Sequence, residues 1–154
     1  MWRELIRELC KDFEPVADLD PGPEFFPGAT PADLEAVERK LGVPLPPSLK
    51  ELLAESNGVL VCFGQHLIWS TDEIASRNLE LRTDPMYEDY MPLDHLLFFG
   101  DAGVDGIQYG FPIGRNGVVR DRIFVWYPME DGREWKAQSL RAYVEGWLTG
   151  KLTV

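Results

Sequence analysis

Cysteine and histidine are scarce in this chain of 154 residues, which contains two of each. Cys10 and Cys62 lack the paired spacing of a metal site, and a chain of this length buries enough surface to need neither a metal nor a disulfide for its core. His66 and His95 lack the HExxH spacing that places two imidazoles on one helical face to bind zinc. We therefore expect no metal and no cofactor.

Long apolar runs are also missing. No stretch approaches the roughly 20 apolar residues that a membrane-spanning helix requires. The first nine residues, MWRELIREL, carry charges where a secretory signal needs an apolar segment. These absences predict a cytoplasmic protein with reduced thiols and no membrane association.

Basic residues are few, with 15 Lys and Arg against 26 Asp and Glu and a formal net charge of -11. Nucleic-acid affinity comes mainly from Lys and Arg that neutralise phosphates, so this balance argues against a nucleic-acid partner. Two interpretations of the acidity stay open. It favours a basic protein as partner, because complementary fields speed encounter, or it serves only solubility.

The clearest positive signal is the segment Gly28–Gly58, which predicts two short helices. Thr30 and Asp33 are typical of the first turn of a helix, and Gly42 is typical of the residue that follows its end. Two prolines then begin a second helix, which ends at Asn57-Gly58.

The remaining segments alternate between helical and strand patterns. Residues 1–14 have the apolar spacing of an amphipathic helix, and residues 15–27, rich in proline, read as an ordered linker without regular structure. Further elements are expected in VLVCF and HLIWS as a hairpin, after Ser70 with Glu73 as a capped helix, in LLFFG, GIQYGF and RIFVWY as strands, and after Ser139 as a final helix. We predict one α+β domain over residues 1–154, in which a central antiparallel β-sheet of about five or six strands is flanked by helices.

These motifs, in this order, resemble the SUKH superfamily, which includes the fungal Smi/Knr-type cell-wall-assembly regulators and many bacterial immunity proteins. The resemblance covers roughly residues 25–150. It rests on Gly28, Glu35, Leu41-Gly42, Leu45-Pro46, Asn57-Gly58, Trp69, Asp72-Glu73-Ile74, Phe99-Gly100, Asp101, Gly103 and Asp105-Gly106. It implies a protein-binding domain that is not an enzyme.

Catalytic motifs are nearly absent, and we assign no catalytic residue. The stretch from Asp101 to Gly106 echoes the start of an EF-hand, but Gly103 replaces an oxygen ligand and Pro112 stands where the bidentate glutamate belongs. We interpret it as a turn between two strands. One alternative is a small hydrolase that uses Asp101, Asp105 and Glu73, which requires these carboxylates to converge within about 5–10 Å in one pocket.

The best candidate for partner contact is the acidic, aromatic loop over residues 83–93. Tyrosine provides rigid contact area, and carboxylates accept charge-assisted hydrogen bonds from Lys and Arg. We also expect two aspartates at an exposed strand turn and one partly exposed tryptophan in DGREWKAQ. The predicted partner-binding residues are Asp84, Tyr87, Glu88, Asp89, Tyr90, Asp101, Asp105 and Trp135.

The leading functional hypothesis is an immunity protein that neutralises a cognate bacterial toxin by covering its functional surface. The partner would be that toxin or another basic protein, and we favour a monomer. The alternatives are a regulatory or scaffold domain with another protein client, and the small hydrolase.

Overall fold

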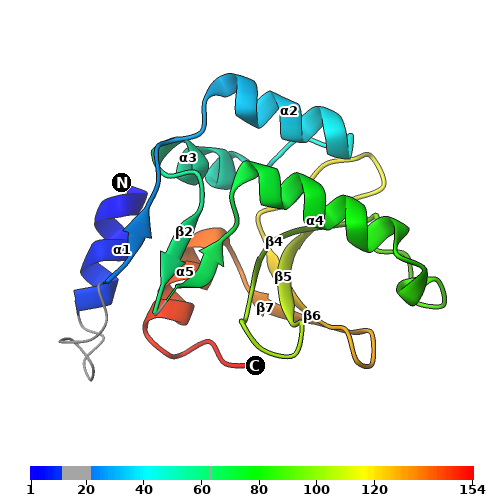
Figure 1. Cartoon of the computed structure of the whole chain (residues 1–154). Coiled ribbons are helices and arrows are strands. Elements are labelled where there is room, and N and C mark those ends of the chain that lie inside the picture. Colours follow the sequence, from blue (N-terminus) through cyan, green and yellow to red (C-terminus); the bar gives the residue numbers. More distant parts are fainter. Residues whose placement is uncertain (12–21, 63) are drawn as a thin grey trace.

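The computed structural model describes residues 1–11, 22–62 and 64–154, in which helices surround two small antiparallel sheets (Figure 1). The helices are α1 (Trp2–Lys11), α2 (Pro31–Leu41), α3 (Pro47–Glu55), α4 (Thr71–Thr83), the short 3₁₀ helix η1 (Pro85–Tyr87) and α5 (Leu140–Leu148). The strands are β1 (Glu24–Phe25), β2 (Val59–Val61), β3 (Gln65–Ile68), β4 (Leu96–Asp101), β5 (Gln108–Pro112), β6 (Ile123–Tyr127) and β7 (Gly132–Ala137). The predicted α+β class is confirmed.

Local capping residues explain where the central helices begin. Thr30 and Asp33 form a reciprocal capping box at the start of α2, and Ser70 and Glu73 form the same arrangement at the start of α4. Each box satisfies backbone N–H groups that have no partner inside the helix. Gly42 ends α2 with a φ of 72°, a left-handed conformation that glycine adopts without strain. All of these boundaries agree with the sequence prediction.

The strands form two sheets instead of the single central sheet that we predicted. The first has the order β1-β2-β3 and the second has the order β4-β5-β6-β7, with every neighbouring pair antiparallel. The sheets meet where β3 passes β4, and there Trp69 N donates to Phe99 O at 2.8 Å. A β-carbon on Gly100 would lie 2.7 Å from Leu67 O, so this approach requires glycine. The two edges therefore touch without forming a continuous ladder.

Helix α5 covers one face of the second sheet and supplies its aromatic core. The fully buried Tyr143 packs against Phe99 and Tyr109, and its hydroxyl donates to Leu67 O at 3.1 Å. Burial in this apolar setting raises the pKa of Tyr143 well above its ordinary value and that of Tyr109 to about 12, so both phenols are neutral. One hydroxyl thus joins α5 to the first sheet as well.

Helix α4 is attached to the same second sheet by a buried amide. Asn78 donates to Phe98 O at 2.9 Å and accepts from Phe98 N at 2.9 Å. These bonds satisfy the edge of β4 where no strand pairs with it. The end of α4, and with it the loop that follows, is thereby placed beside the sheet.

Two strands were not predicted. Glu24–Phe25, inside the segment interpreted as a linker, pairs with β2 as strand β1, and Gly132–Ala137 pairs with β6 as strand β7. Strand β7 carries charged residues at an exposed edge, which removes the apolar alternation by which a strand is recognised. The predicted helix over 1–14 is described as Trp2–Lys11; residues 12–14, and residues 15–21 of the linker, lie outside the described residues. Within the described chain, no helix is long and apolar enough to cross a membrane.

Candidate protein-binding surface

The negative charge of the protein is concentrated in one part of the chain. Residues 83–114 contain six carboxylates and no Lys or Arg, and so contribute -6 to the formal net charge of -11. In the structure this stretch forms the loop between α4 and β4, strands β4 and β5, and the turn that joins them (Figure 1). A partner that approaches these two loops meets an excess of negative charge.

Aromatic packing places the predicted binding loop against the second sheet. The ring of Tyr87 lies 5.4 Å from that of Trp126 and 5.3 Å from that of Tyr90, measured between centroids. The Tyr90 hydroxyl donates to Pro128 O. Burial, followed by the charge of Asp84, raises the pKa of Tyr87. Both predicted tyrosines are thus partly buried and support the loop.

A mostly buried ion pair, Asp131 with Arg133, holds the far end of the same loop. The two side chains are 14% and 12% exposed and lie 2.9 Å apart. Asp131 also accepts from Met91 N at 2.9 Å and from the indole of Trp126 at 2.9 Å. Arg133 donates to Met91 O at 2.7 Å and to Pro92 O at 3.1 Å. Both the N–H and the C=O group of Met91 are therefore hydrogen-bonded to the β6–β7 hairpin.

The charge state of this pair follows from its contacts. Partial burial opposes ionisation of Asp131, but hydrogen bonds from Trp126, Arg133 and Met91 outweigh it and lower its pKa. Burial and then the positive charge of Arg133 lower the pKa of His95, whose Nε2 lies 3.0 Å from the guanidinium. The pair is consequently charged, and the adjacent imidazole neutral, at pH 7.

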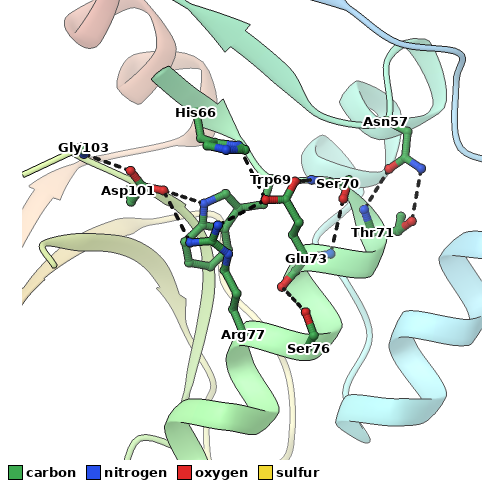
Figure 2. A network of polar contacts seen from close by, with 10 residues as sticks. All are labelled: Asn57, His66, Trp69, Ser70, Thr71, Glu73, Ser76, Arg77, Asp101 and Gly103. Carbon is green, nitrogen blue, oxygen red and sulfur yellow. Dashed lines mark hydrogen bonds and ion pairs between the residues drawn. The ribbon is translucent and has the colours of Figure 1, made fainter. Parts of the chain in front are cut away.

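Asp101 belongs to a second polar network, at the junction of the two sheets (Figure 2). Its carboxylate accepts from the indole of Trp69 at 2.8 Å and from Gly103 N at 2.9 Å. The guanidinium of Arg77 lies 4.7 Å from the centroid of the Trp69 ring, 3.3 Å from Glu73 and 3.9 Å from Asp101. Asp101 thus fixes the turn after β4 and presents little free charge.

The carboxylates of the hydrolase hypothesis do not share one pocket. Asp101 and Asp105 line an open hollow of about 360 Å³, whereas Glu73 lines a separate hollow of about 230 Å³. Glu73 is also occupied by the α4 capping box and by Arg77. The arrangement has the properties of a structural network, and it does not bring all three carboxylates of the hypothesis into one pocket.

The two acidic loops adjoin through the β6–β7 turn. Tyr90 bonds to Pro128 from one side, and from the other side Gly106 is so close that a β-carbon on it would lie 3.2 Å from Pro128 Cγ. We call the combined segments 84–94, 102–106 and 128–131 the acidic face. It contains no Lys or Arg and presents the exposed carboxylates of Asp84, Glu88, Asp89, Asp94, Asp105 and Glu130.

Trp135 lies outside the acidic face. It is 55% exposed, as predicted, and the Arg122 guanidinium lies 3.7 Å from its ring centroid. Trp135 and Arg133 are two residues apart on β7, so they project from the same side of the sheet. Trp135 is therefore on the same side as the ion pair, but in a locally basic setting.

Sequence reasoning missed the ion pair and the contribution of the β6–β7 turn. Asp131 and Arg133 contact residues some 40 positions earlier, a separation at which no local pattern is informative. The one available signal was the absence of Lys and Arg between Arg82 and Arg115. Among the described residues no group of three His, Cys, Asp or Glu side chains has the arrangement of a metal site.

Comparison with known families agrees with this architecture. The family profile described as SMI1-KNR4 cell-wall (SUKH_6) matches residues 31–144, from the start of α2 into α5. No curated protein matches the chain significantly. Since the matched segment covers well over half of the chain, the protein belongs to the SUKH superfamily.

Proposed function

We propose that this protein is an immunity protein, which binds a basic toxin through its acidic face and neutralises the toxin by covering its functional surface. The observation that carries the proposal is the acidic face: six exposed carboxylates on a backbone held by aromatic packing and an ion pair, in segments that themselves contain no Lys or Arg. The SUKH family includes immunity proteins, and its domains generally bind other proteins without catalysing a reaction.

The physics of association suits such a face. A backbone that is already held in place loses little conformational freedom on binding, so more of the interaction energy of its carboxylates remains as affinity. A field of one sign also accelerates encounter with an oppositely charged partner and weakens as salt rises. An inhibitory interface of standard size covers about 1,600 Å² in total, which is enough to occlude a nuclease cleft or a similar basic site.

A regulatory or scaffold role with another client is the second candidate. It is favoured by the cell-wall description of the matching family profile. In that case the same face would bind a basic protein that is not toxic. The two candidates therefore share a surface and differ in what the partner does when it is unbound.

The test uses the product of the gene adjacent to the one that encodes this protein. The product is expressed in cells with and without this protein, and binding is measured by calorimetry at about 0.05 and 0.3 M NaCl, since salt screens exposed charges. We expect the adjacent product to be toxic alone, growth to be restored by this protein, and affinity to fall with salt. Binding without toxicity would instead support the regulatory role, and absence of both binding and rescue would refute immunity.

A matched pair of variants tests the surface itself. Glu88→Lys with Asp89→Lys reverses two exposed charges of the acidic face, whereas Glu4→Lys with Glu51→Lys makes the same charge change on α1 and α3. The first variant should lose affinity at least about tenfold, equivalent to 1.4 kcal/mol, and the second should bind almost as the wild type does. Equal loss in both variants would show that only the net charge matters.

A further inference from the structure

Methionine is concentrated on the acidic face. The chain has four methionines, and three of them lie within the segments of that face. Met86, Met91 and Met129 are 73%, 57% and 83% exposed. Single exposed apolar residues are ordinary on protein surfaces, but three long flexible ones among six exposed carboxylates form a surface of mixed character.

The backbone beneath two of these side chains is held firmly. Met86 N donates to the Asp84 carboxylate at 2.9 Å, and both peptide groups of Met91 are bonded to Asp131 and Arg133. The third, Met129, follows Pro128, whose carbonyl accepts from Tyr90, and lies in the β6–β7 turn. The side chains project into solvent from these positions. A fixed backbone that carries adaptable side chains suits contact with apolar groups of varied shape.

We propose that the acidic face takes a protein segment that is both basic and apolar, whose Lys or Arg side chains meet the carboxylates while its apolar side chains pack among Met86, Met91 and Met129. The inference rests on the proposed function in taking a basic protein as the ligand and the acidic face as its binding surface, and it adds the apolar component. Charge complementarity selects the basic component, and the exposed thioether side chains select the apolar one. A purely basic partner would leave three exposed methionines without a role in the contact.

The methionines also provide the assay. In protein labelled with ¹³C at the methionine methyl groups, three signals report on the acidic face, and Met1, on the distant α1 end of the molecule, is an internal control (Figure 1). The probe is a synthetic amphipathic peptide of Leu and Lys, and the matched probe has every Leu replaced by Gln. We expect the Leu peptide to shift the signals of Met86, Met91 and Met129 while Met1 stays unchanged, and the Gln peptide to shift them far less at about 0.5 M NaCl, where charge attraction is screened.

Two results would overturn the proposal: equal shifts with the two peptides at high salt, or a shift of Met1 as large as the other three. Replacement of the three methionines by Gln preserves the charge and the approximate length of each side chain. It should lower the affinity for the Leu peptide at least about tenfold and leave the weak affinity for the Gln peptide unchanged. One result separates the two proposals. If the Glu88→Lys, Asp89→Lys variant no longer binds the cognate partner while the triple Gln variant binds it as the wild type does, this inference is refuted and the proposed function is sustained. The opposite pattern would refute the electrostatic proposal and sustain the apolar contact.

Discussion

Replacement of Asp131 by glycine would release the acidic loop from the β6–β7 hairpin. The carboxylate accepts hydrogen bonds from Trp126, Met91 and Arg133, and the Trp126 and Arg133 side chains have little access to water. Asp131 has a φ of 53°, so alanine would add backbone strain that glycine avoids. The glycine variant therefore removes the carboxylate and leaves the turn free to keep its conformation.

The expected cost follows from the donors that lose their acceptor. A buried polar group without a partner costs about 1–3 kcal/mol, and loss of one member of a largely buried ion pair costs about 3–5 kcal/mol. Arg133 keeps the carbonyls of Met91 and Pro92, which offsets part of this penalty. We expect the free energy of unfolding to fall by about 3 kcal/mol, which at this chain length lowers Tm by about 6–12 °C.

Urea unfolding and hydrogen exchange test the effect. Glu130→Gly is the matched control, because it removes one charge and adds similar freedom to the unfolded chain at the neighbouring, exposed residue. Asp131→Asn keeps one oxygen acceptor and should fall between the two. Amides of residues 84–94 should exchange faster in Asp131→Gly at a urea concentration where the rest of the protein is still folded. If Asp131→Gly and Glu130→Gly lose equal stability, the ion pair does not hold the loop.

Two further predictions concern pH and the junction of the sheets. Folding lowers the pKa of Asp131 below its ordinary value of 3.8, so its contribution to stability is complete above that value and is lost as pH falls further, through the lower pKa of the folded state. The stability difference between wild type and Asp131→Asn should therefore be constant above about pH 5 and shrink below about pH 4. A difference that grows in acid would contradict the assignment. Gly100→Ala places a β-carbon 2.7 Å from Leu67 O and should lower the free energy of unfolding, measured in urea, by about 1–3 kcal/mol. The control is Gly114→Ala, whose β-carbon would lie nearest the exposed Asn116 side chain and should cost less. Equal losses in the two variants would show that β3 and β4 separate without penalty.

The elements that sequence reasoning placed correctly are those whose signals are local. The capping boxes of α2 and α4 join residues three apart, and helical apolar spacing identified α5. Both signals lie within a few turns of one helix, so they can be recognised without knowing the rest of the chain. The order of these elements was also sufficient to recognise the family.

The elements that were missed depend on distant partners. Strand β1 has two residues and exists only because β2 offers an edge to it, and β7 is a charged strand that is defined by pairing with β6. The division into two sheets depends on how closely β3 passes β4, which a strand prediction does not contain. Strand pairing is a long-range choice, and local composition constrains it weakly.

For this protein, the sequence by itself determined the boundaries of α2, the starts of α3, α4 and α5, the α+β class, the family and the acidity of the loop over residues 83–93. Only the tertiary structure decided that Tyr87 and Tyr90 support that loop, that Asp101 is committed to Trp69, and that Met86, Met91 and Met129 are exposed in the segments of the acidic face. The physical reason is range. Caps and periodicity act between neighbours in the chain, whereas the acidic face is assembled by hydrogen bonds and ring contacts between segments that the chain brings together only when it folds.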